Sequence, residues 1–297
     1  ICTTYFLTFF SELIPPTGLP ISIKTRSAMF HSEEYIVDKN DRWMIQKYLH
    51  LQFGGATAIE DKFAPRHDAA FVFHFGDRPI LRDGSNYVLE PFFIASIQRR
   101  ALQMCIQGNL DSFIVICKPT VLSRLYNLDM DPVSKHSISL PNNQLYPIWE
   151  QLKNCSTFTQ RVALFQSYIN HSFPAPYIPD AIDKLYEEIV NHAINTPLKY
   201  LIETCGGSPR TIERNFIHRL GVSPKTLMRI VRFNYLWDKI RTEHVVDYQD
   251  LVFDCHFFDQ SHFIKDFKDI IGETPSYFFK RNLQHLQIIS GKGAGNS

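Results

Sequence analysis

The spacing of apolar side chains changes character along the chain. Before residue 172, apolar residues often recur at every second position, as in Phe71, Phe73 and Phe75. A period of two is typical of a β-strand with one buried face. From Asp180 onward, apolar residues recur at spacings of three and four, the period of an α-helix. The pattern predicts an α+β chain, with a sheet-rich N-terminal part and a helical C-terminal part.

Residues 1–118 are predicted to form short strands separated by turns. Residues 100–106 alternate in polarity, Gly108-Asn109 follows, and the apolar run Phe113–Cys117 comes next. This order predicts a hairpin that turns at Gly108-Asn109. Gly76-Asp77 and Asp83-Gly84 mark further turns. Several short strands in succession favour a small barrel or sandwich.

Three helices are predicted to accompany this sheet. Pro119 fits the first turn of a short helix that ends near Asn127. Residues 143–171 predict two more helices. Leu152, Phe165 and Ile169 lie on their apolar faces, which would pack either on the barrel of the same chain or against a second copy. The sequence leaves both arrangements open.

A proline-rich stretch separates the two parts. Residues 172–179 contain three prolines, which cannot continue a helix and favour an extended linker. We expect a semi-rigid spacer with few contacts across it. The predicted division is an N-terminal domain at 1–171, a linker at 172–179, a helical domain at 180–283 and a flexible tail at 284–297.

Within the helical domain, residues 208–224 and 259–275 repeat the same spacing, offset by 51 residues. Each copy opens on a residue that can cap a helix, continues with three apolar residues four apart, and ends on Gly followed by Ser/Thr-Pro. The apolar residues are Ile212, Phe216 and Leu220 in the first copy and Phe263, Phe267 and Ile271 in the second. The pattern predicts a helix-turn-helix unit twice, joined by one long helix.

The polar faces of these two helices carry side chains that suit DNA. Long hydrogen-bonding side chains near a helix N-terminus can enter the major groove and reach base edges. The residues that we expect to contact DNA are Arg210, Thr211, Glu213 and Arg214 in the first copy and Gln260, Ser261, His262 and Lys265 in the second.

These motifs resemble the AraC/XylS family of bacterial transcription regulators. The resemblance covers about residues 181–282 and rests on Gly221-Val-Ser-Pro224, Arg232, the run Phe257–Phe263, Phe267-Lys268, Gly272 and Thr274-Pro-Ser276. It implies a cytoplasmic, sequence-specific regulator that binds double-stranded DNA. Its recognition helices, at about 208–220 and 259–271, would enter successive major grooves. It also implies a sensor or dimerisation role for residues 1–171, and leaves a small-molecule effector and a homodimer open.

A plainer interpretation of the same residues stays open. Arg210, Glu213 and Arg214 could form a solvated helix face, and Arg214 could instead form an ion pair inside the domain. We interpret Arg232, on the long linking helix, as a structural residue.

The nearly balanced charge of the chain limits how strongly it can bind DNA without sequence specificity. The chain of 297 residues has 31 Lys and Arg against 30 Asp and Glu, so no bulk charge attracts a partner. Residues 181–297 carry 15 basic and 14 acidic residues. Strong nonspecific binding is therefore not expected, and the acidic residues must lie away from DNA. A helical domain that binds protein instead of DNA remains an alternative.

An enzyme is the other alternative, as a barrel with an accessory helical domain. His50, His67 and His74 with Glu60 could suggest a metal site, but no HxH or HxxxH motif is present. The six cysteines form no CxxC pair, and no phosphate-binding loop or nucleophile elbow occurs. We therefore expect no catalytic residue, no metal and no cofactor. The apolar runs are also too short to span a membrane.

Overall fold

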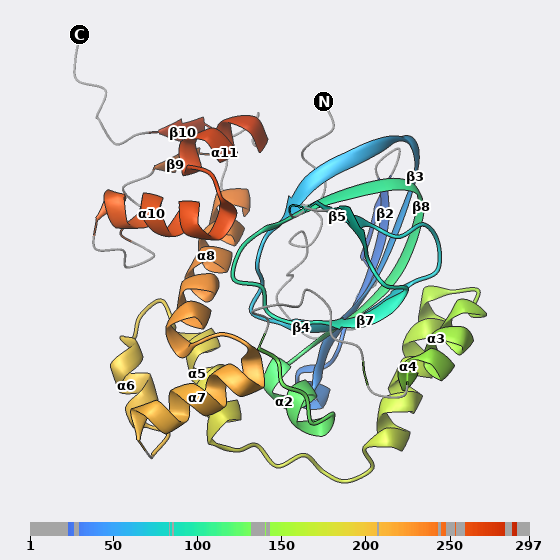
Figure 1. Cartoon of the computed structure of the whole chain (residues 1–297), viewed down its shortest axis with the longest axis horizontal. Helices are drawn as coiled ribbons and strands as arrows, with labels where there is room; N and C mark the ends of the chain where they lie inside the picture. The colour runs from blue at the N-terminus through green and yellow to red at the C-terminus, as the bar shows by residue number, and fades with distance from the viewer. Residues whose placement is uncertain are drawn as a thin grey trace.

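A computed structural model of the chain describes residues 23–26, 30–82, 84, 86–131, 140, 143–206, 208–242, 245–247, 253, 259–282 and 287–289. Figure 1 shows a barrel of strands beside a cluster of helices, with two further helices on the opposite side of the barrel. The α+β class and its order along the chain are as predicted.

The barrel is one antiparallel sheet of eight strands among the described residues. Its main path runs β1-β2-β3-β8-β4-β7, and β5 pairs with both β6 and β8. The strands are β1 (Ile23–Arg26), β2 (Phe30–Ile36), β3 (Ile45–Phe63), β4 (Ala69–His74), β5 (Ile80–Arg82), β6 (Asn86–Val88), β7 (Phe92–Ala95) and β8 (Leu102–Cys117). A 3-10 turn, Lys39–Asp41, lies between β2 and β3.

The hairpin predicted at Gly108-Asn109 is wrong. Strand β8 passes through these residues without turning back, and pairs with β3 from Leu102 to Cys117 with a register shift near Gly55. Gly108 has φ of +82°, a conformation that glycine adopts without strain. Asp77 supplies the reason for the bend: its Oδ2 accepts from the Asn109 N–H at 2.7 Å. A glycine bend of this kind lets a long strand follow a barrel wall.

Strand β4 was predicted to bury one face, but both of its faces are buried. Phe71 and Phe73 point outward into an apolar cluster beneath helices. Ala70, Val72 and His74 line the interior of the barrel. The strand is therefore enclosed on both sides, and period two alone cannot distinguish this from a strand with one solvated face.

Helices α2 (Pro119–Leu125), α3 (Tyr146–Lys153) and α4 (Phe158–Ser172) follow the barrel. The apolar faces of α3 and α4 pack on their own barrel, because Leu152 and Phe165 are fully buried and Ile169 is 2% exposed within a single chain. Of the two arrangements that the sequence left open, the structure therefore has the one in which both helices pack on their own barrel. These three residues are not exposed for contact with a second copy.

The remaining helices form the C-terminal cluster of Figure 1. They are α5 (Ala181–His192), α6 (Leu198–Glu203), α7 (Pro209–Leu220), α8 (Pro224–Thr242), α10 (Gln260–Ile271) and α11 (Pro275–Asn282). Ser208 caps α7 and Asp259 caps α10 through their side chains, and Gly221 and Gly272 end these helices in the left-handed conformation. The helix ends are as the repeated spacing predicts.

The linker differs from the expected spacer with few contacts. Tyr177 stacks on Trp43 of the barrel (6.1 Å between ring centroids) and donates from its hydroxyl to Asp183 Oδ2 of α5 at 2.7 Å. The carbonyl of Ile178 accepts from Arg124 of α2 at 2.9 Å. The prolines do keep this stretch out of a helix, but its side chains dock on both parts.

Two predictions fall wholly or partly outside the described residues. The apolar pattern before the second repeated segment also predicts a short helix at about 247–255, and of these residues the structure describes only Asp247 and Phe253. Of the tail expected after residue 283, the described part is a strand, β10 (Gln287–Ile289), which pairs in parallel with β9 (Val245–Asp247). That pairing differs from the flexible tail that we expected at these three residues.

Candidate nucleic-acid interface

The first recognition helix, α7, separates an apolar face from a polar one. Phe216 and Leu220 are fully buried and Ile212 is 6% exposed, in the core of the C-terminal helices. The residues predicted to contact DNA from this helix are all exposed to solvent: Arg210, Thr211, Glu213 and Arg214. The Thr211 hydroxyl also lies 2.9 Å from the Ser208 hydroxyl, which holds it at the N-terminal cap.

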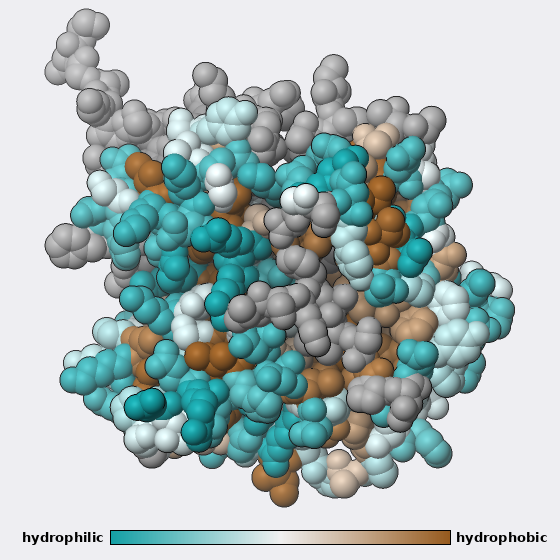
Figure 2. All heavy atoms as spheres, in the orientation of Figure 1, coloured by the Kyte–Doolittle hydropathy of each residue, from teal (hydrophilic) through white to brown (hydrophobic). Residues whose placement is uncertain are grey.

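The second recognition helix, α10, repeats this division. Phe263 and Phe267 are buried, and their rings pack 5.9 Å apart. The four residues predicted to contact DNA from α10 are exposed as well: Gln260, Ser261, His262 and Lys265. The structure therefore brings each predicted group together on one solvated helix face, and the surface over α7 and α10 is mostly hydrophilic in Figure 2.

Arg210, Arg214 and Lys265 are the Arg and Lys residues predicted to contact DNA from these faces. Among the described residues, none forms an ion pair with Arg210, Arg214 or Lys265. The internal ion pair that we considered for Arg214 is thus absent from this part of the chain. Their charge is available to an external anion such as a phosphate.

Three acidic residues on or near α10 are paired with basic side chains. On α10, Asp266 and Asp269 bind Arg229 of α8 at 2.9 and 3.2 Å. Glu273, just after α10, binds Lys62 of the barrel at 2.8 Å. These pairs neutralise three carboxylates that would otherwise repel the phosphates of DNA.

Helix α8 connects the two units. Phe233 packs against Phe267 of α10, with ring centroids 5.6 Å apart. Arg232 donates from Nε to the carbonyl of Ala193, the residue that ends α5, at 2.9 Å. Arg232 therefore has a structural contact within the domain, as the sequence interpretation held.

The N-terminal domain holds the first unit through Arg219, near the end of α7. Its guanidinium binds Asp180 and Asp183 of α5 at 2.8 and 3.0 Å, and donates to the Thr120 carbonyl and the Ser123 hydroxyl of α2 at 3.1 Å each. Burial raises the pKa of Asp180, but hydrogen bonds from the Asp183 N–H and from Arg219 outweigh it and hold that pKa below its usual value.

Further contacts reach the carboxyl ends of both recognition helices. For α7, the Met130 N–H donates to the His218 carbonyl at 2.9 Å, and Arg99 donates to the Gly221 carbonyl at 3.2 Å. For α10, the Ala101 N–H donates to the Ile270 carbonyl at 2.7 Å, and Lys62 donates to the Ile271 carbonyl at 3.0 Å. We call these four residues, Lys62, Arg99, Ala101 and Met130, the clamp.

The two domains also share a core. Ile97, which follows β7 of the barrel, is fully buried in the apolar cluster formed by α5, α7 and α8. On the other side of this junction, the Tyr186 hydroxyl of α5 donates to the His67 carbonyl at 3.3 Å. The contacts bury side chains from both domains, and thus tie the helical domain to the barrel.

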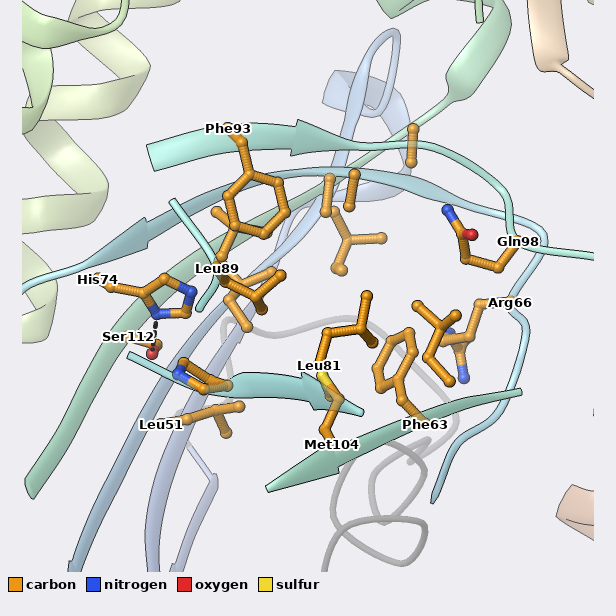
Figure 3. A pocket seen from close by; sticks show the side chains of 18 of the residues that line it. Leu51, Phe63, Arg66, His74, Leu81, Leu89, Phe93, Gln98, Met104 and Ser112 are labelled. Carbon is orange, nitrogen blue, oxygen red and sulfur yellow. Dashed lines mark hydrogen bonds between the residues drawn. The ribbon is translucent and has the colours of Figure 1, made fainter. Parts of the chain in front are cut away.

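The barrel encloses a largely apolar cavity of about 120 Å³. Figure 3 shows His74 and Ser112 at one end, joined by a hydrogen bond of 2.7 Å, and Arg66 and Gln98 at the other. Burial, with the positive charge of Arg78 adding to it, lowers the pKa of His74 to about 4. The imidazole is therefore uncharged at neutral pH.

The cavity and the clamp share the same short segments. Phe63, Gln98 and Leu102 line the cavity. Each is next in sequence to a clamp residue: Lys62, Arg99 and Ala101, respectively. The same short segments therefore form part of the cavity wall and contact the ends of α7 and α10.

Sequence reasoning missed the clamp and Arg219, because they join residues that are 36 to 209 positions apart. No local pattern signals such contacts. The sequence singled out His74 only as one of the histidines of a possible metal site, and the cavity that it lines follows only from closure of the barrel.

The histidines considered for a metal site have other roles. His50 Nε2 lies 2.9 Å from Asp111 Oδ1, and Arg161 of α4 binds both oxygens of Asp111 at 2.7 and 3.1 Å. Within the described residues, no group of three His, Cys, Asp or Glu side chains converges as metal ligands. No helix in this part of the chain is both long and apolar enough to cross a membrane.

Comparison with known protein families gives a match within the C-terminal helical domain. Residues 201–281 match the family model described as a helix-turn-helix domain. Among curated protein sequences, none matches the chain.

Solved structures give weaker similarities. ToxT from Vibrio cholerae bound to an unsaturated fatty acid is 16% identical, with a TM-score of 0.45 over 89% of this chain and 100% of ToxT. Another ToxT structure is 11% identical, with a TM-score of 0.43 over 86% of this chain and 99% of that one. A Bacillus subtilis oxalate decarboxylase mutant is 8% identical, with a TM-score of 0.25 over 32% and 27%. Similarities of this size reveal nothing about ligand or activity.

The match covers α7, α8 and α10, the elements that carry both exposed polar faces and the buried rings of Phe216, Phe263 and Phe267. The family model and the geometry of the helices thus concern the same residues. At residues 201–281 the chain therefore carries a helix-turn-helix domain.

Proposed function

We propose that this protein is a sequence-specific transcription regulator that binds double-stranded DNA through α7 and α10. The observation that carries the proposal is the pair of exposed polar helix faces within a helix-turn-helix domain. The polar side chains of each helix would contact the bases or phosphates of one half of the DNA site. In α7 these are Arg210, Thr211, Glu213 and Arg214, and in α10 they are Gln260, Ser261, His262 and Lys265. Such a protein shares a compartment with its DNA, which in a bacterium is the cytoplasm.

The two helices would enter successive major grooves on one side of the duplex. Helix α8 has 19 residues, which corresponds to a length of roughly 28 Å at 1.5 Å per residue. Recognition helices held along such a rod are separated by a distance similar in size to one helical turn of DNA, about 34 Å. A single chain would then cover two adjacent turns.

The barrel would act as the sensor of a small molecule. Its apolar cavity is the binding place, and the clamp is the route by which occupancy would reach DNA binding. A ligand changes an equilibrium only when it binds one of two arrangements more tightly than the other. Here the two arrangements would differ in how Arg99, Ala101 and Lys62 hold the ends of α7 and α10.

Selection of bound duplexes from a random DNA pool by the full chain tests the proposal. We expect enrichment of a two-part motif whose halves lie about one helical turn apart, with affinity that falls as salt rises. Enrichment that persists in a variant with both Arg210 and Lys265 replaced by Ala would contradict the assigned faces. An absence of any enriched motif, together with a protein partner bound independently of salt, would favour the protein-binding alternative.

A further inference from the structure

His74 places in the wall of the barrel cavity a buried polar atom that has no hydrogen-bond partner among the described residues. His74 is 5% exposed, and its Nδ1 is bonded to the Ser112 hydroxyl, but its Nε2 makes no hydrogen bond with any described residue. In Figure 3 the His74 ring lies against the cavity together with Leu89 and Phe93. A buried polar atom without a partner is costly, and so a bound molecule that supplies one is favoured.

Among the described residues, the other polar groups of the lining have partners, except for Asp68 Oδ1, which makes no hydrogen bond. Gln98 donates to the Ser96 carbonyl at 3.1 Å. Arg66 lies 3.4 Å from Asp68 Oδ2, and the second oxygen of Asp68 lies 3.4 Å from His67 Nε2. Asp68 Oδ1 belongs to the charged cluster with Arg66 and His67, and His74 Nε2 is the polar atom of the lining that lacks a hydrogen bond outside that cluster.

The lining presents no net charge to a ligand. Burial raises the pKa of Asp68, but the charges of His67, Arg66 and Lys47 hold it below its usual value, so that Asp68 is ionised and balances Arg66. His74 is neutral at the same pH, because burial lowers its pKa. A charged ligand would have to leave water without gaining an unpaired countercharge, which opposes its binding.

The size of the cavity limits the ligand to a small ring. The volume is about 120 Å³, and an apolar cavity of about 150 Å³ in another protein accommodates benzene. The apolar wall includes five side chains labelled in Figure 3: Leu51, Leu81, Leu89, Phe93 and Met104.

We propose that this cavity binds an uncharged molecule of about one aromatic ring that carries a hydroxyl group, and that His74 Nε2 is the hydrogen-bond partner of that hydroxyl. A hydroxyl suits either tautomer of the imidazole, because it can donate to a bare Nε2 or accept from a protonated one. The inference rests on the proposed sensor role of the barrel and adds the chemical class of its ligand.

Calorimetric titration of the full-length chain with three matched probes tests the ligand class. The probes are p-cresol, toluene, which lacks the hydroxyl, and p-toluate, which replaces it with a carboxylate. We expect p-cresol to bind about 3- to 10-fold more tightly than toluene, the gain of one hydrogen bond, and p-toluate to bind most weakly. Equal binding of p-cresol and toluene, or tightest binding of p-toluate, would overturn the proposal.

Two variants locate the effect at His74. In His74→Leu, p-cresol should lose its advantage while toluene still binds. The double variant His74→Leu/Ser112→Ala gives the same comparison without an unpaired Ser112 hydroxyl, in case the single variant folds poorly. A cavity-filling control, Ala70→Leu, should weaken both probes, and full p-cresol binding to a folded Ala70→Leu would place the site elsewhere and contradict the proposal.

The measurements separate this inference from the proposed function. DNA selection with unliganded protein tests the recognition helices and involves no probe. If a motif is enriched but p-cresol does not bind, the ligand class is wrong and DNA binding stands. If p-cresol binds through His74 but no DNA is selected, the cavity site stands and the regulator proposal fails.

Discussion

Arg210 and Arg214 are the residues on which DNA binding is most directly tested. Both are exposed at the beginning of α7, and no described residue neutralises them. Replacing either by Ala should weaken specific binding by about 1–3 kcal/mol for each good base interaction that the arginine makes, with the fold intact. Equilibrium binding to the selected duplex at two salt concentrations measures the effect.

Arg82→Ala is the matched control for these variants. Arg82 is an exposed arginine on β5 of the barrel, where it pairs with Glu60 at 2.8 Å. Its removal changes net charge equally and should leave DNA affinity unchanged. If Arg82→Ala weakens binding as much as Arg210→Ala does, overall charge is responsible and α7 does not read the site.

The interactions of Asp111 should make the free energy of unfolding fall at acid pH. Burial raises its pKa, but hydrogen bonds from His50 and Arg161 outweigh burial and hold the pKa at about 2, below the ordinary 3.8. The pairing therefore stabilises the fold above about pH 4 and is lost as pH falls toward 2. After allowance for solvent near the carboxylate, the effect is on the order of 1 kcal/mol.

Chemical unfolding of wild type and Asp111→Asn measures this contribution. Asp111→Asn should be less stable near neutral pH, since it leaves Arg161 buried without its counterion. The difference between the two proteins should shrink between pH 5 and pH 2.5. A difference that stays constant over this range would show that ionisation of Asp111 does not matter.

At the scale of elements, the two recognition helices are held by their aromatic faces. Phe216 is fully buried and Phe267 is 2% exposed. Phe216→Ala and Phe267→Ala should each lower the free energy of unfolding by about 3–5 kcal/mol, because each leaves a cavity. Ile264→Ala, at a 37% exposed position on α10, is the control and should cost less than half as much. Thermal unfolding distinguishes them, and equal losses would mean that the helix faces are misassigned.

The bend of β8 gives a second test on an element. A Cβ at Gly108 would lie 2.2 Å from Asp77 Oδ2, whereas a Cβ at Gly84 meets no atom within 4 Å. Both glycines have positive φ, and so Gly84→Ala measures backbone strain alone, about 1 kcal/mol. Gly108→Ala should cost clearly more in denaturant unfolding. Similar losses for the two would show that the Asp77 contact does not hold the bend.

At the scale of the whole molecule, the clamp ties the helical domain to the barrel. Replacing Lys62 and Arg99 together by Met removes one side-chain hydrogen bond to each recognition helix. Amide hydrogen exchange at the carboxyl ends of α7 and α10 should then rise about 5-fold or more, which corresponds to ~1 kcal/mol of local stability.

Lys153→Met is the control for the clamp variant. Lys153 is an exposed residue of α3, where it lies over the Trp149 ring, and α3 contributes no residue to the clamp. Its replacement should leave exchange in α7 and α10 unchanged. Unchanged exchange in the Lys62/Arg99 variant would mean that the shared core around Ile97 alone holds the domains together.

Much of this molecule is determined by the sequence. Helix ends follow from local chemistry, because Ser208 and Asp259 cap their own helices and Gly221 and Gly272 adopt positive φ. The exposed and buried faces of α7 and α10 follow from the 3.6-residue period, which does not depend on distant contacts. The residues proposed to contact DNA were therefore identifiable before the structure.

Other features were decided by the tertiary structure. The path of β8 through Gly108 depends on a hydrogen bond from Asn109 to Asp77, 32 residues away. The packing of Phe165 on its own barrel, the junction at Arg219 and the cavity at His74 depend on how the sheet closes and where the helices dock on it. Polarity patterns report that a face is buried, but they do not report what buries it. That choice is made by contacts between segments far apart in the chain.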